Sequence, residues 1–173
     1  VVDNCRLYRV NPTDGARQLI HNLGISDQLC NELQPYQLLA VSQDNSFVAL
    51  STFNDARNGI EVAIVDLRTT DFPVSHYSSA RGWPQSWSPD NTQLLFVDLY
   101  SRTGCILDIA NNTVTRCFTP PYRNGLPVYG MPFYWTNDGE NLFFGDRQPS
   151  SPGGMAYMNL DNDAFTNFFT SGE

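Results

Sequence analysis

The stretch WSPDNTQLLFVD (residues 87–98) decides the fold, because it joins a strand end, a tight turn and a buried strand. Trp87 ends an extended segment, and residues 89–91 supply the reversal, since Asp accepts backbone N–H bonds in turns and Asn tolerates positive φ. The apolar run at 94–97 is continuous, which suits a strand buried on both faces. The stretch therefore predicts a strand, a turn and an inner strand of a sheet.

The same pattern occurs three times at a regular spacing. Residues 41–52 (VSQDNSFVALST) and 135–146 (WTNDGENLFFGD) align with the first stretch without gaps. The Asp that all three share is Asp44, Asp90 or Asp138, and it recurs after 46 and 48 residues. Because it recurs once per repeat, we interpret it as a structural turn residue. Helical periodicity is nearly absent, so this period indicates propeller blades.

Each repeat also contains signals for two further strands. Third strands are expected at 60–67, 105–109 and 155–160, and shorter fourth strands at 72–76, 114–118 and 165–169. Four strands per repeat is the pattern of a propeller blade. The first residues match only the second half of this pattern, with expected strands at 7–11 and 16–20.

The sequence therefore predicts an all-β fold of β-propeller blades with four antiparallel strands each. A single domain, 1–173, is expected to hold about three and a half blades: a half blade at 1–20 and blades at about 36–77, 83–119 and 131–170. The residues expected to be buried between blades are Trp87, Trp135, Val48, Leu50, Leu94, Phe96, Leu142 and Phe144. The turn aspartates are expected to lie outside this core.

The repeats resemble a known family. WSPDN followed by LLFV, within residues 87–97, is similar to the strand–turn–strand motif of TolB-type β-propeller repeats, and VDL at 65–67 looks like the third strand of that repeat. The resemblance covers nearly the whole chain and implies a propeller fold. Gln43 and Asn137 stand where the motif has proline. Family members usually carry six or more blades in one chain, and this chain has fewer.

Composition restricts the possible partners. The chain has 173 residues and is 41% hydrophobic, which suffices for a packed core. Its ten basic residues are all Arg, against 18 acidic residues, and the net charge of −8 predicts no nucleic-acid partner. The apolar runs are too short for a membrane span. No charged and then apolar segment begins the sequence, so we expect that any signal peptide has been removed.

The four cysteines are predicted to form two disulfides. Cys105 and Cys117 lie at equal distances from Asn111, in the middle of an expected turn, so paired strands would place them opposite each other. A bridge between Cys5 and Cys30 would pin the long connection that contains Cys30. Buried free thiols are the alternative. The absence of Lys and a glycosylation sequon at Asn111 also favour an oxidising location: the periplasm, the cell surface or outside the cell.

No pattern in the sequence indicates catalysis. The Gly-x-Ser-x-Gly turn of hydrolases is absent, and the small-residue cluster at 151–154 reads as a loop. The only histidines, His21 and His76, are expected at blade edges, and a zinc site lacks ligands. Asp161 and Asp163 offer oxygen ligands for calcium, but residues that favour turns surround them, and a hairpin turn is the preferred interpretation. We therefore expect no catalytic residue, cofactor or metal.

Two functions remain open. The first is a non-catalytic secreted module that contacts proteins, above all copies of itself, because three and a half blades leave apolar faces and a strand edge uncovered. Such subunits would form a ring of about seven blades or a filament; closure of the chain on itself ranks last. The second is the propeller part of a larger secreted enzyme such as a prolyl-oligopeptidase-like peptidase. The aromatic, proline-rich connection at 118–135 is a further candidate binding surface.

Overall fold

The computed structural model describes most of the chain as β-strands and turns. The residues it describes are 2–3, 6–22, 39–53, 59–101, 103–118, 122–123, 126–127, 134–145 and 155–167. Within these ranges every regular element is a strand, and no helix is present that could cross a membrane. The chain divides into two compact units, Val1–Pro84 and Gln85–Glu173.

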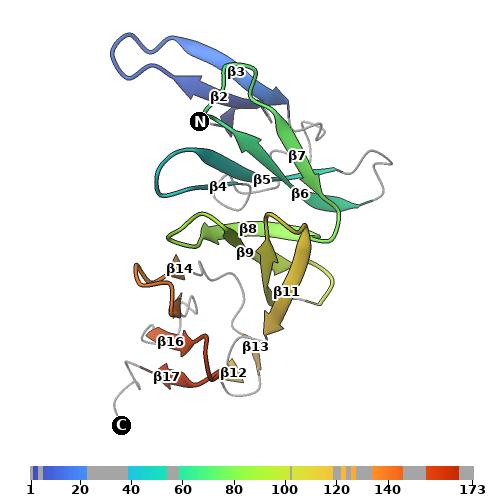
Figure 1. Ribbon diagram of the computed structural model, residues 1–173, viewed down its shortest axis with the longest axis vertical. Coiled ribbons are helices and arrows are strands. Elements are labelled where there is room, and N and C mark those ends of the chain that lie inside the picture. Colours follow the sequence, from blue (N-terminus) through green and yellow to red (C-terminus); the bar gives the residue numbers. More distant parts are fainter. Residues whose placement is uncertain are drawn as a thin grey trace. The chain divides into compact units, whose positions relative to one another are not determined.

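The first unit contains two antiparallel sheets (Figure 1). One sheet is formed by β1 (Val2–Asp3), β2 (Arg6–Val10) and β3 (Arg17–Asn22). The other is formed by β4 (Leu39–Val41), β5 (Phe47–Phe53), β6 (Ile60–Asp66) and β7 (Val74–Tyr77). Strands that are consecutive in sequence are neighbours in each sheet, as in a propeller blade.

The second unit repeats this arrangement. Its first sheet comprises β8 (Gly82–Trp87), whose start precedes the unit boundary, β9 (Gln93–Asp98), β10 (Gly104–Asp108) and β11 (Thr113–Phe118). Its last sheet comprises β14 (Tyr134–Trp135), β15 (Asn141–Gly145), β16 (Met155–Asn159) and β17 (Phe165–Asn167). The predicted all-β fold with antiparallel four-stranded blades is thereby confirmed.

The structure corrects three details of the predicted strands. The first sheet has three strands instead of two, because Val2–Asp3 pairs with the free edge of β2. A small hairpin of β12 (Tyr122–Arg123) and β13 (Leu126–Pro127) interrupts the expected connection between blades. The strand β7 begins at Val74 instead of Phe72, since Phe72 has a φ of 47° and belongs to the turn.

Positive backbone φ angles recur in two turns of the repeat. In the turn before the second strand of a blade they occur at Asn45, Asn91 and Gly139. In the turn before the fourth strand they occur at Gly15, Phe72, Asn112 and Asp163. Asn and Gly enter this region at little cost, which is why turn residues were such a strong signal in the sequence.

Within each unit the two sheets pack face to face. In the first unit, Leu7 of β2 forms one cluster with Val48 and Leu50 of β5 and with Ala63 and Val65 of β6. In the second unit, the clustered residues are Leu95, Ile106 and Phe118 from one sheet and Trp135, Leu142 and Met158 from the next. Packing between sheets is therefore what forms the core.

Most of the predicted core residues are buried. Seven of them are at most 8% exposed: Trp87, Trp135, Val48, Leu50, Leu94, Phe96 and Leu142. The side chain of the eighth, Phe144, lies outside the described part of the structure.

Candidate interaction surface

The three repeat aspartates build the same hydrogen-bonded turn. Asp90 Oδ1 accepts bonds from the Ser88 hydroxyl (2.6 Å) and the Thr92 N–H (3.1 Å), while Ser88 Oγ accepts one from the Gln93 N–H (2.9 Å). The partner of each Asp is the serine or threonine two residues before it, which recurs in all three stretches and is a further signal in the sequence. The equivalent pairs are Ser42 with Asp44 and Thr136 with Asp138. This geometry fits the interpretation of these residues as structural.

The turn hydrogen bonds favour the ionised carboxylates. The Ser46 N–H and the Ser42 hydroxyl lower the pKa of Asp44 from 3.8 to about 2. The Ser88 hydroxyl and the Thr92 N–H lower the pKa of Asp90 in the same way. At Asp138 the pKa is lowered by the Thr136 hydroxyl and a backbone N–H. A carboxylate that accepts several such bonds resists protonation.

The lowered pKa values predict a stability loss in acid. A group whose pKa falls on folding stabilises the protein above its unfolded value, and the stabilisation disappears as pH drops through the folded value. For Asp44 this window runs from 3.8 down to about 2. Thermal unfolding of Asp44→Asn should therefore show a smaller drop in Tm between pH 4 and pH 2 than wild type. Asp71→Asn, an equal charge change in another exposed turn, is the control, and identical pH profiles for wild type and Asp44→Asn would contradict the prediction.

The strands β10 and β11 bring Cys105 and Cys117 together. Cys105 lies directly opposite Cys117, and the two form a disulfide, as the symmetric spacing predicted. Asn111 lies exposed in the turn between these strands, where its side-chain amide donates a hydrogen bond to Asp108 (3.0 Å). Its glycosylation stays a prediction. Cys5 and Cys30, the other expected pair, lie outside the described residues.

One of the two aspartates considered for calcium, Asp163, is engaged within the fold. The Arg116 guanidinium of β11 contacts the Asp163 carboxylate and the Leu160 carbonyl in the turn between β16 and β17. Within the described part of the chain, no group of three His, Cys, Asp or Glu side chains is placed to hold a metal ion. Arg116 thus links two neighbouring sheets. The sequence alone indicated Asp163 only as a turn residue or a calcium ligand.

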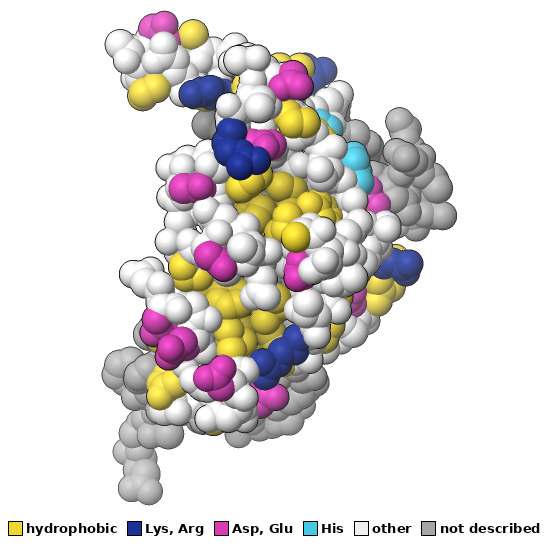
Figure 2. Space-filling model, viewed as in Figure 1, with side chains coloured by type: hydrophobic (Ala, Val, Ile, Leu, Met, Phe, Trp, Pro, Cys, Tyr) yellow, Lys and Arg dark blue, Asp and Glu magenta, His cyan; other side chains and the backbone are white. Residues whose placement is uncertain are grey.

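The two histidines lie close together in the first unit, where Figure 2 draws them as neighbouring cyan side chains. His21 belongs to β3 and His76 to β7, so their electrostatic interaction acts between two sheets. Burial lowers the pKa of His21, and the nearby His76 adds to this effect. His76 Nδ1 lies 2.7 Å from Oε1 of Glu61, a buried carboxylate on β6. The arrangement joins polar groups across a sheet-to-sheet contact.

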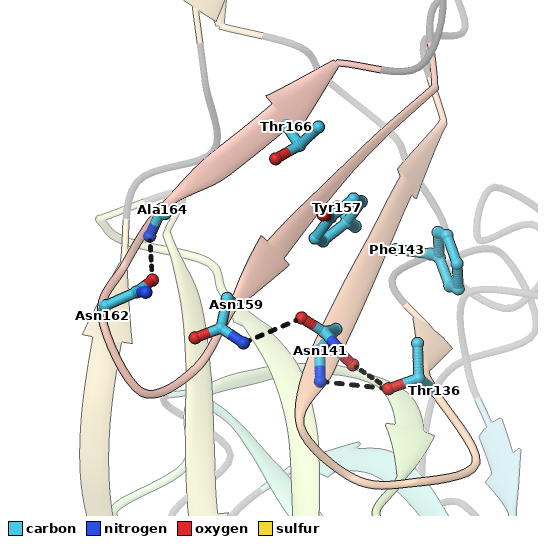
Figure 3. A pocket seen from close by; sticks show the side chains of 8 residues that line it. All are labelled: Thr136, Asn141, Phe143, Tyr157, Asn159, Asn162, Ala164 and Thr166. Atoms are coloured by element: carbon cyan, nitrogen blue, oxygen red, sulfur yellow. Dashed lines mark hydrogen bonds between the residues drawn. The ribbon is translucent and has the colours of Figure 1, made fainter.

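The last sheet has an outward face with a pocket of about 450 Å³ (Figure 3). The pocket is lined mainly by alternate residues of β15, β16 and β17, which we call the C-terminal face: Asn141, Phe143, Tyr157, Asn159 and Thr166. The rings of Phe143 and Tyr157 meet edge to face with centroids 6.5 Å apart, and the Asn159 amide donates to Asn141 (3.1 Å). None of the pocket-lining residues is charged.

The repeat pattern shows which face of the preceding sheet is equivalent to the C-terminal face. Phe143 and Tyr157 pair across β15 and β16 as Leu95 and Ile106 pair across β9 and β10. Leu95 and Ile106 are 0% and 4% exposed, because they pack with the core residues of the following sheet. Phe143 and Tyr157 are only partly buried. The C-terminal face is thus built like a face that another sheet covers. The proline-rich connection proposed as a binding surface is largely outside the described residues, although Tyr134 at its end is exposed.

Comparison with solved structures assigns the fold. TolB from Acinetobacter baumannii matches 96% of this chain with a TM-score of 0.62 and 15% identity, and the chain covers 38% of it. The β-propeller domain of the Trilobed protease from Pyrococcus furiosus matches 95% at 0.57 and 15% identity, with 48% of it covered. A chain of the nidogen/laminin complex matches 98% at 0.61 and 14% identity, with 58% covered.

These similarities define a TolB-type propeller fold. At such identities the likeness concerns the fold alone, and the chain spans about 38% to 58% of the length of these three structures. No protein-family model matches the sequence, and no curated protein is similar enough in sequence to be matched.

Proposed function

We propose that this chain is a non-catalytic, secreted β-propeller module that acts in protein–protein contacts, chiefly with copies of itself, as a structural subunit. The observation that supports this most directly is the C-terminal face. Its central aromatic pair occupies positions that are covered by a neighbouring sheet in the preceding repeat. Burying one large apolar side chain contributes about 1.5–3 kcal/mol, so covering this face with protein is favourable.

Charge and oxidation state support the rest of the proposal. A net charge of −8 disfavours contacts with nucleic acid, and the Cys105–Cys117 disulfide suits the periplasm or the cell exterior, where disulfides persist. Turn hydrogen bonds engage the repeat aspartates, and His76 is bound to Glu61. These contacts support structural roles for the repeat aspartates and for His76.

A second candidate function is the propeller portion of a larger secreted enzyme. Its support is the likeness to the propeller domain of the Trilobed protease and to an acylaminoacyl peptidase from Pyrococcus horikoshii. The chain covers 48% of the former and 27% of the latter. The mass of the polypeptide in its natural source separates the two functions, because the enzyme part requires a much longer chain.

Self-association is the direct test of the first function. Light scattering coupled to size exclusion, on the purified 173-residue chain at micromolar concentration, is expected to detect species larger than the 19.4 kDa monomer. The proportion of these species should rise with concentration, because association follows mass action. A well-folded monomer with no larger species over the whole concentration range would contradict the proposal.

A further inference from the structure

We propose that the C-terminal face of one copy binds the outer face of the first sheet of a second copy, in a head-to-tail contact. This inference rests on the proposed function and adds the two surfaces that make the contact. It requires a second described face whose residues suit such packing. The sheet β1–β3 provides one.

One face of the first sheet packs in the core of the first unit, and its other face points away from that core. Leu7 of β2 is buried against the second sheet. Tyr8 and Val10, the alternate residues of the same strand, lie opposite Leu19 and Arg17 of β3. We call these four residues the N-terminal face. Leu19 is 51% exposed, and Tyr8 and Val10 are partly exposed, so apolar surface is available on this face.

The turn between β2 and β3 has the same pair of hydrogen bonds as the turn between β16 and β17 of the last sheet. In the turn between β2 and β3, the Thr13 N–H bonds to Asn11 Oδ1 (2.9 Å) and the Ala16 N–H bonds to Asp14 Oδ1 (2.8 Å). In the turn between β16 and β17, the corresponding bonds join Asp161 to Asn159 (3.1 Å) and Ala164 to Asn162 (2.9 Å). The matching turns place β2 and β3 in the role of third and fourth blade strands.

The equivalence of β2 and β3 to third and fourth blade strands shows what each of the two faces is built to contact. When the turns are aligned, Tyr8 and Val10 occupy the positions of Ala63 and Val65 in β6. Ala63 and Val65 are completely buried, because the preceding sheet covers them through Leu7. The N-terminal face is therefore built to receive a preceding sheet, and the C-terminal face is built to receive a following one. A second copy supplies both at once.

Charge favours the same pairing. Arg17 lies on the N-terminal face, with its guanidinium 5.9 Å from the centre of the Tyr8 ring. Glu140 and Asp161 are exposed in the two turns that border the C-terminal face. Figure 2 shows acidic side chains, in magenta, gathered over these turns of the last sheet. The turn beside Arg17 also carries the exposed Asp14, so it is the attraction of Arg17 for the acidic border of the C-terminal face that favours this orientation of the contact.

Arginine substitutions on either face test the contact. Thr166→Arg and Phe143→Arg place a cation on the C-terminal face, which meets the face that carries Arg17 in the second copy, and Leu19→Arg places one within the apolar N-terminal face. Each variant is expected to weaken self-association at least about tenfold in sedimentation velocity, since a desolvated or like-charged contact costs more than the 1.4 kcal/mol of a tenfold change. Tyr100→Arg, at a residue 68% exposed in the turn after β9, is the control and should associate like wild type.

A mixing experiment tests the head-to-tail arrangement. Leu19→Arg keeps an intact C-terminal face, and Thr166→Arg keeps an intact N-terminal face. Each variant alone should be largely monomeric, and their mixture should form a one-to-one dimer that does not grow, because the remaining faces of that dimer are both blocked. Near-ultraviolet circular dichroism identifies variants that fail to fold. Thr166 is exposed, so its substitution keeps the test valid if Phe143→Arg does not fold.

The outcomes separate this inference from the proposed function. If wild type associates and the face variants associate equally well, the two faces are wrong while self-assembly stands. If the mixture of variants remains monomeric, the contact is not head to tail. If wild type itself stays monomeric, both the proposed function and this inference fail, and cover of the C-terminal face by a different chain or a further blade becomes the explanation.

Discussion

Replacing Phe96 with Ala is expected to lower the free energy of unfolding by about 3–5 kcal/mol. Phe96 lies in the middle of β9, is 1% exposed and is the largest of the fully buried side chains in the described part of the chain. Removing the ring costs its transfer free energy and leaves a cavity that the rigid strands fill poorly. Urea unfolding at one fixed protein concentration measures the loss.

Two matched variants serve as controls for the Phe96→Ala prediction. Phe96→Leu keeps most of the apolar volume and should cost clearly less than Phe96→Ala. Tyr100→Ala removes another aromatic ring from the same hairpin, but at an exposed position, and should change stability by no more than about 0.5 kcal/mol. A loss below about 1 kcal/mol for Phe96→Ala would mean that the strand register is wrong.

Removing the disulfide between β10 and β11 is expected to cost about 2–4 kcal/mol. The bridge joins residues 12 positions apart, so it restricts the unfolded chain around the turn at Asn111. The double variant Cys105→Ala and Cys117→Ala leaves no unpaired thiol at this site. Its urea midpoint should be lower than that of wild type when both are measured without reductant, so that Cys5 and Cys30 are treated alike.

Peptide mapping under non-reducing conditions supplies the control for that experiment. A peptide pair joined through Cys105 and Cys117 is expected, together with a pair joined through Cys5 and Cys30. A peptide that joined Cys5 to Cys105 would contradict the pairing, and it would also remove the interpretation of the measured stability loss.

The sequence by itself determined the blades, because their turns depend on local chemistry. An Asp that accepts backbone bonds, followed by Asn or Gly with positive φ, specifies a reversal wherever it occurs, as at Asp90 and Asn91. The apolar run after each turn then identifies an inner strand. The opposed positions of Cys105 and Cys117 followed from the same local symmetry.

Only the tertiary structure decided how the sheets meet. The contact of Arg116 with Asp163 joins residues 47 positions apart, and the electrostatic interaction of His21 with His76 depends on two sheets packing together. The strand β1 also depends on tertiary structure, because its two residues carry no strand pattern of their own and form a strand only by pairing with β2. Such long-range contacts leave no period in a sequence.

The C-terminal face illustrates this difference most clearly. In the sequence, Leu142 and Phe143 continue the same apolar pattern as Leu94 and Leu95. In the structure, Leu95 is buried by the following sheet, whereas Phe143 is partly exposed beside a pocket. Alternation along a strand assigns each side chain to one of two faces, but what covers a face depends on which sheet packs against it.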